Sequence, residues 1–143
     1  MQRTLRVVAS VVLWTLACLP AFAADVAKAA ASSPQAKVYE TMRKAVAAGD
    51  YNGMRATMSK ATLAKMDQQN KDMHLDTKKG MEMMKDMAAT DVKFTDLKVT
   101  GTKAVLEATG KVMGEANWGT IEETNEGGQW KIDSESWTNT KKK

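Results

Sequence analysis

The sequence predicts an α+β domain in which N-terminal helices pack over a curved four-stranded antiparallel sheet. Three observations predict this fold class. Apolar residues recur with helical spacing over 34–89, and from Thr90 onward they alternate with a period of two. Glycine-containing turns separate the alternating segments, as in antiparallel hairpins. With 143 residues, 43% of them hydrophobic, the chain has room for one folded domain.

Residues 1–23 have the order of a secretory signal peptide. Two arginines are followed by an apolar run over 7–19, and the segment Ala21-Phe22-Ala23 fits a cleavage site. The apolar run is shorter than the roughly 20 residues that cross a bilayer. We therefore expect cleavage near Ala23, a periplasmic or secreted protein, and no transmembrane span in the mature chain. The alternative is a lipoprotein anchored at Cys18, although the residues before this cysteine depart from a lipoprotein signal.

The domain itself is expected over 34–138. The small residues of 24–33 predict a flexible lead-in that precedes it. Ser33 can cap the first helix, Pro34 suits the first helical turn, and Gly49 is a natural stop. The first helix is therefore expected between the proline and the glycine.

Further helices are expected before the sheet begins. Asp50 can cap a second, short helix, and Ser59 can start a third segment. The polar residues 68–77 predict a loop or a frayed helix end, and 78–89 predicts a fourth helix with methionines along one stripe. At the other end of the chain, residues 139–143 form a basic tail.

The four strands follow from the alternation of apolar residues. Val92 and Phe94 have the opposite parity to Leu97 and Val99, so we expect a bulge near Thr95-Asp96. One extra residue at that point would return both pairs to the same face of the sheet.

The later strands are separated by turns at 100–102 and 126–128. In the last strand, Trp130 and Ile132 share parity, and we expect both to point into the core. Trp137 has the opposite parity, so we expect it to cover the other face of the sheet or an interface.

Charge and cysteine content exclude several classes of function. The net charge of +4 comes from the arginines of the leader and from Lys141–Lys143. A near-neutral body lacks the basic face that nucleic-acid binding needs, so no nucleic-acid partner is expected. Cys18 is the only cysteine, so the processed chain has no thiol nucleophile or thiolate metal site. We expect no cofactor.

Three short segments carry a resemblance to a known family. They are VYE over 38–40, AGDY over 48–51 and GQWKI over 128–132. With them, the chain resembles small exported bacterial members of the nuclear-transport-factor-2-like (SnoaL-like) superfamily. The resemblance implies a cone-shaped domain with a pocket between the first helices and the concave face of the sheet. The pocket residues that we expect are Tyr39, Tyr51, Trp118, Asp133 and Trp137.

Members of that superfamily include isomerases, dehydratases and non-enzymatic binding domains, and a shared fold does not decide between them. We expect a non-enzymatic domain that binds a small apolar ligand or a protein partner, and that dimerises through the sheet face. No catalytic residue is expected, because the only histidine, His74, lies in a polar connection and no nucleophile–base motif is present. The enzymatic alternative needs a lone buried carboxylate with a raised pKa, such as Asp133 or Glu122.

Methionine is unusually abundant and unevenly distributed. Of the 11 methionines, all except Met1 and Met113 lie between Met42 and Met87. Filling irregular gaps between helices and sheet is one use of such flexible side chains. The other is a soft-metal site, because thioethers bind Cu(I) and Ag(I). The ligands of that site would be His74, Met81, Met83, Met84 and Met87.

Overall fold

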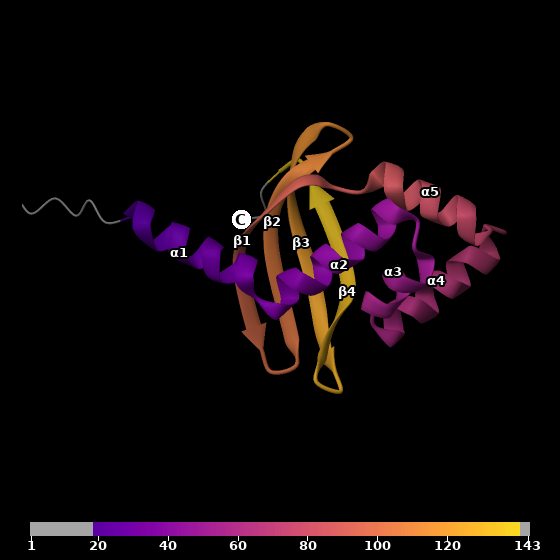
Figure 1. Ribbon diagram of the computed structural model, residues 1–143, viewed down its shortest axis with the longest axis horizontal. Coiled ribbons are helices and arrows are strands. Elements are labelled where there is room, and N and C mark those ends of the chain that lie inside the picture. Colours follow the sequence, from indigo (N-terminus) through magenta and orange to yellow (C-terminus); the bar gives the residue numbers. More distant parts are fainter. Residues whose placement is uncertain (1–18, 141–143) are drawn as a thin grey trace, which may run out of the picture.

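The computed structural model describes residues 19–140 and the side chains of residues 23–140. In this part of the chain, five helices precede a four-stranded antiparallel sheet, which confirms the α+β fold class. Figure 1 shows α1 and α2 in line across the sheet, with α3, α4 and α5 beyond the β4 edge. Most of the predicted leader, including Cys18, lies outside the described residues, as do the three terminal lysines.

The helix ends follow the predicted capping residues. The Ser33 hydroxyl accepts a hydrogen bond from the Ala36 amide at 3.0 Å, and Gly49 ends the same helix with a left-handed φ of 71°. Asp50 and Ser59 cap the next two helices in the same way. The helices are α1 (Leu19–Ser32), α2 (Pro34–Ala48), α3 (Tyr51–Thr57), α4 (Lys60–Asp72) and α5 (Thr77–Met87).

Two segments are more helical than the sequence predicts. Residues 24–33, expected as a flexible lead-in, are helical up to Ser32, and Ala30 is only 1% exposed. Alanine has the highest intrinsic helix propensity, and α1 gains contacts by packing along β1. The polar segment 68–77 is predicted to be a loop or a frayed helix end, and α4 continues regularly through its first half, to Asp72. Lysine and glutamine are good helix formers, which explains why this polar segment extends the helix.

The strands form a simple meander in which each strand pairs with the next along the chain. The predicted bulge in the first strand is confirmed, since the register shifts between Phe94 and Asp96. The register of the first strand also shifts between Thr90 and Lys93, and a further bulge lies in the last strand, where Glu122 faces Ser134 but Glu123 faces Ile132. The strands are β1 (Thr90–Thr100), β2 (Lys103–Val112), β3 (Glu115–Glu126) and β4 (Gln129–Thr138).

The β4 bulge changes the predicted position of Trp137. Ile132 is buried as predicted, whereas Trp130 is only half-buried. Because the bulge at Asp133 adds one residue to β4, the side chains beyond it switch faces. Trp137 therefore lies on the same face as Ile132 and packs against the core, not on the opposite face.

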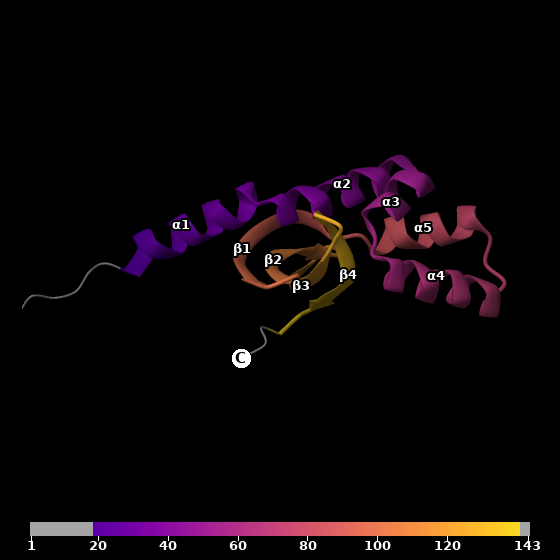
Figure 2. The same ribbon diagram turned by 90° about the horizontal axis from the view of Figure 1, so that it is seen from below.

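The core fills the concave side of the sheet beneath α2. Figure 2 shows how strongly the sheet curls below this helix. Tyr39 and Met42 of α2 are nearly inaccessible, as are Leu106 and Ile121 of the sheet. The Tyr39 ring meets Phe94 edge to face, with 6.1 Å between ring centroids. The space in which the superfamily resemblance places a pocket is thus occupied by the protein's own side chains.

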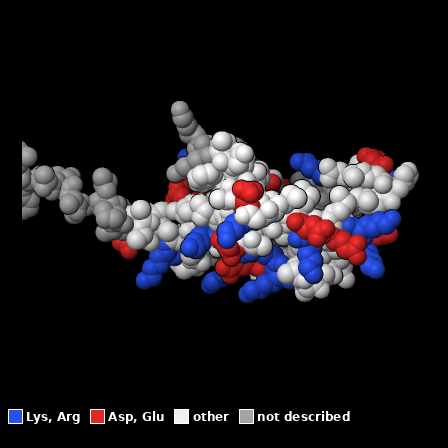
Figure 3. Space-filling view, turned by 90° about the horizontal axis from the view of Figure 1, so that it is seen from above, with Lys and Arg blue, Asp and Glu red and all other residues white. Residues whose placement is uncertain are grey.

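The surface of the described residues carries both signs of charge. Figure 3 shows lysine and arginine side chains interspersed with aspartate and glutamate over one face of the molecule. Within residues 19–140, no helix combines the length and the apolar character needed to cross a membrane.

Candidate functional site

An apolar cleft lies between α4 and α5, beside the edge of β4. Its volume is about 350 Å³, and the side chains of six methionines line it. We call it the methionine cleft. In Figures 1 and 2 the two helices lie beyond β4, away from the core under α2. The methionines are Met66, Met73, Met81, Met83, Met84 and Met87.

Helix α5 divides its side chains between this cleft and a second hollow. Gly80, Met83, Met84 and Met87 follow one another at helical spacing and line the methionine cleft. The adjacent stripe of α5, from Lys78 to Lys85, lines a groove of about 460 Å³ against the end of α2.

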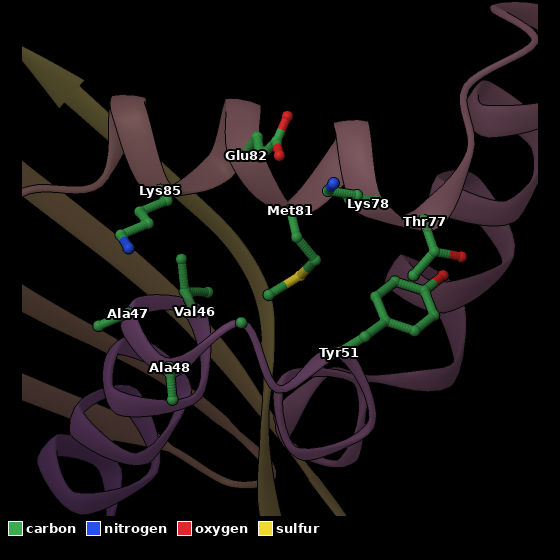
Figure 4. A pocket seen from close by; sticks show the side chains of 10 residues that line it. Val46, Ala47, Ala48, Tyr51, Thr77, Lys78, Met81, Glu82 and Lys85 are labelled. Atoms are coloured by element: carbon green, nitrogen blue, oxygen red, sulfur yellow. The ribbon is translucent and has the colours of Figure 1, made fainter.

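Met81 lies between the two hollows and lines both. Figure 4 shows its side chain extending from α5 into the space between Val46 and Tyr51. It is the only buried residue of α5, and α4 has no buried residue at all. Met81 is therefore the principal apolar anchor of the α4–α5 pair.

By burial, the methionines form two groups with a set between them, since Met81 belongs to the core and Met66 and Met84 pack against it while all three line the cleft. Met42, Met54 and Met58 belong to the core, as expected for side chains that fill gaps between helices and sheet. Met83 and Met87, in contrast, are 46% and 65% exposed while they line the cleft. Core packing does not account for this second group, so the cleft surface needs another explanation.

A charged pair braces the wall of the cleft formed by α3 and α4. The Arg55 guanidinium donates hydrogen bonds to both carboxylate oxygens of Asp67, with Nη2 to Oδ2 at 3.1 Å, and to the Tyr51 hydroxyl at 3.2 Å. It also lies 5.4 Å from the centre of the Tyr51 ring. These hydrogen bonds hold the pKa of Asp67 below its usual range. Arg55 thereby fixes the Tyr51 ring as part of the wall.

Glu135 contributes a carboxylate to the same cleft. It stands opposite Ile121 in the sheet, so its side chain emerges on the concave face, at the exposed edge of β4. Its charge acts on the Tyr39 hydroxyl in the core, whose pKa is raised by burial and by the Glu135 carboxylate. The cleft therefore has an apolar wall of methionines and one anionic group.

Of the predicted pocket residues, Tyr51 alone lines the methionine cleft. Tyr39 belongs to the core, and Trp137 packs against its edge. Trp118 is 38% exposed on the outer face of the sheet, beside a shallow hollow of about 150 Å³. Asp133 forms an ion pair with Lys103 at 2.7 Å. The structure does not bring these five residues together.

The predicted metal ligands are brought together in part. Met81, Met83, Met84 and Met87 all line the cleft, whereas His74 does not. The histidine lies exposed in the α4–α5 connection with a left-handed φ of 50°. Within the described side chains, no group of three or more histidine, cysteine, aspartate or glutamate residues could hold a metal ion. The ligands that the cleft offers to a soft metal ion are the methionine thioethers.

Glu123 is a buried ionisable residue that the sequence analysis missed. Its side chain is 0% exposed, and neither carboxylate oxygen has a hydrogen-bond partner among the described residues. Burial raises its pKa to about 8. Its parity with Ile121 two residues earlier is the signal that could have placed it on the core face. It lines neither of the hollows beside α5, so no substrate there reaches it.

The two carboxylates named for the enzymatic alternative have other surroundings. Burial alone would raise the pKa of Asp133, but the Lys103 ammonium holds it below its usual value. Glu122 is exposed and accepts a hydrogen bond from the Ser134 hydroxyl. Neither group lines the methionine cleft.

Comparisons with known proteins give no match. No family model matches the chain, and no curated protein or solved structure matches it significantly. The methionine cleft is therefore the feature from which a function can be derived.

Proposed function

We propose that this protein is a non-enzymatic binding protein that holds a small apolar ligand in the methionine cleft. The observation that carries the proposal is the set of six methionines around one cavity of about 350 Å³. Ligand pockets typically measure about 300–1,000 Å³ and are mostly apolar. Methionine side chains adapt their shape to a ligand because they are unbranched and polarisable.

The burial of the cleft residues supports this role. Met83 and Met87 expose apolar surface that the fold leaves uncovered. Covering such surface with an apolar molecule is favourable by about 25 cal/mol per Å². The cleft also lacks a nucleophile with an adjacent base, so binding is better supported than catalysis.

Gly80 offers a way to test the proposal. It lines the cleft, and a Cβ atom at this position would meet nothing within 4 Å. Gly80→Phe should therefore fill the cleft without displacing the backbone. Gly80→Ala is the matched control, since it also replaces the helix-weakening glycine but adds no ring to the cleft.

The measurement is the fluorescence of Nile red, a neutral apolar dye, during titration with each protein. We expect the wild type and Gly80→Ala to bind the dye, and Gly80→Phe to lose at least about tenfold in affinity, which corresponds to 1.4 kcal/mol. Circular dichroism checks that the three proteins fold alike. Equal binding by both variants, or no binding by the wild type, would overturn the proposal.

Soft-metal binding is a second candidate, favoured by the same cluster of sulfur atoms. We propose Cu(I) or Ag(I) as the ions, because thioethers bind these soft ions in preference to harder ones. Met81, Met83, Met84 and Met87 would supply the ligands, with Met66 and Met73 on the same cleft. His74 has no part in this arrangement.

One double variant separates the two candidates. Met83→Leu with Met87→Leu removes two thioethers but keeps the apolar character and approximate size of the side chains. Under the apolar-ligand proposal it still binds Nile red. Under the metal proposal, Ag(I) shifts the methionine methyl NMR signals of the wild type and has a much weaker effect on the variant. Methyl signals that do not respond to Ag(I) would remove the metal candidate.

We further propose that the chain is exported, with cleavage near Ala23, and that it is a nuclear-transport-factor-2-like domain. The order of charged, apolar and small residues in the leader supports export. The helices lying over a curled antiparallel sheet agree with the cone shape that the resemblance implies. The proposed ligand site differs from that resemblance, because it lies beside the cone.

A further inference from the structure

We infer that the ligand of the methionine cleft is a small cationic amphiphile, an amine or quaternary ammonium with an apolar chain, whose head group contacts Glu135. This inference rests on the proposed function and adds the charge of the ligand to it. Three features of the cleft carry it: its only charged group, the surroundings of that group, and the size of the cavity.

The charge of the cleft comes from one residue. Among the described side chains that line it, Glu135 is the only charged one. Within the described part of the chain, no lysine, arginine or histidine nitrogen lies within 4 Å of its carboxylate. Glu135 is an exposed residue, so a cation bound in the cleft would form a partly exposed ion pair with its carboxylate.

The other polar groups of the cleft also favour a cation. The side-chain oxygens of Gln69 and Asn70 can accept hydrogen bonds from a protonated amine, whereas a quaternary ammonium, which has no N–H group, would be attracted by the charge of Glu135 alone. No cationic side chain is present in the lining to attract an anion. The lysines Lys78 and Lys85 line the groove on the other side of α5 instead.

The size of the cavity favours a small molecule over a protein segment. A volume of about 350 Å³ lies near the lower end of the range for drug-sized ligands. The methionines occupy the walls along α5 and α4, while Glu135 lies on the sheet side. An amphiphile with its chain between the helices and its head group at β4 fits this polarity.

Three probes with the same octyl chain test the inference in the full mature protein. They are octyltrimethylammonium, octyl glucoside and octyl sulfate, each kept below the concentration at which it forms micelles. Isothermal titration calorimetry at low salt measures their dissociation constants. We expect the cationic probe to bind about fivefold more tightly than the neutral one, the gain typical of a partly exposed ion pair. The anionic probe should bind more weakly than both.

Glu135→Gln tests the residue, and Glu115→Gln is the matched control. Glu115 is exposed at the start of β3 and lines neither hollow beside α5, so the control removes the same charge elsewhere. We expect Glu135→Gln to bring the cationic and neutral probes to equal affinity and to leave octyl glucoside unchanged. Glu115→Gln should keep the fivefold preference.

The outcomes distinguish the inference from the function on which it rests. Equal binding of the cationic and neutral probes by the wild type overturns the inference but leaves the apolar-ligand proposal standing. A preference that persists in Glu135→Gln also overturns it, because the selectivity then comes from another group. Binding of none of the three probes overturns the proposed function, and this inference with it.

Discussion

The indole ring of Trp137 rests against Gly119, its cross-strand partner on β3. A Cβ atom at position 119 would lie only 2.7 Å from Cη2 of the indole and 2.8 Å from two further ring atoms. Gly110 on β2 also lies beneath the indole, since a Cβ there would lie 3.2 Å from the same ring. The ring therefore lies over two strands, and a side chain at position 119 would overlap it, whereas one at position 110 would only crowd it.

Gly119→Ala should destabilise the fold. The added methyl group would overlap the indole, and overpacking of this kind costs about 1–3 kcal/mol. Urea denaturation should report the loss as a lower midpoint. Gly80→Ala serves as the control for a glycine with open space around it, and it should be neutral or stabilising.

A double-mutant cycle tests whether the indole is the cause. In a Trp137→Ala background the obstructing ring is absent, so Gly119→Ala should then cost almost nothing. If Gly119→Ala lowers the free energy of unfolding equally in both backgrounds, contact with the Trp137 ring does not explain its effect.

Glu123 should make the stability of the protein depend on pH. Its pKa is raised from 4.5 to about 8 in the folded state. The folded state holds the proton of Glu123 more tightly than the unfolded state does. The free energy of unfolding is therefore highest below pH 4.5, the pKa in the unfolded state, and it falls as the pH rises toward 8. The loss should amount to about 3 kcal/mol between pH 5 and pH 8.

Glu123→Gln should remove most of this pH dependence, because the amide does not ionise. At pH 5 the variant should unfold at a urea concentration similar to that of the wild type. At pH 8.5 it should be more stable than the wild type. Glu122→Gln, at the neighbouring exposed position, should keep the wild-type slope. A carboxyl NMR titration of Glu123 with a midpoint near 4.5 would contradict the burial of this group.

The Ser33 side chain should contribute more to the free energy of unfolding than that of its neighbour Ser32. The Ser33 hydroxyl accepts from the Ala36 amide and donates to the Ala30 carbonyl at 2.6 Å, so it joins the end of α1 to the start of α2. Ser33→Ala should cost about 1 kcal/mol in the free energy of unfolding, as expected for a lost N-cap. Ser32→Ala removes an exposed hydroxyl bonded only within α1 and should change little.

Processing of the leader can be followed by mass. We expect the protein recovered from the exported fraction of an expressing bacterium to begin at Ala24. Ala30 and its contacts would survive this cleavage, so the mature domain should melt at a temperature close to that of the full chain. A product that begins at a lipidated Cys18 would instead support the lipoprotein alternative.

Most of the fold could be predicted because the local signals agree with the tertiary structure. Ser33, Gly49 and Asp50 each act at a helix end through short-range hydrogen bonds or a special φ, which the sequence reveals directly. The bulge near Thr95 was also readable, because apolar residues on both sides of it record the change of parity.

The position of Trp137 could not be predicted in the same way. The β4 bulge falls at Asp133, and Trp137 is the one large apolar residue that follows it in the strand, so its change of parity fits either a bulge or a side chain on the other face. The methionine cleft depends on how α4 and α5 lie relative to the β4 edge, which is a long-range relationship. Helical spacing placed Met81 and Met84 on a stripe, but it did not indicate which methionines the core would leave exposed.

The α4–α5 pair is attached to the rest of the domain with little apolar burial, since Met81 is its only buried side chain. A molecule that binds between these helices only when they are folded would therefore stabilise their folded form. A bound molecule should slow amide hydrogen exchange in both helices and leave exchange in the central strands unaltered. The bound and free forms of the protein would then differ in the rigidity of these two helices, while the sheet keeps the same structure.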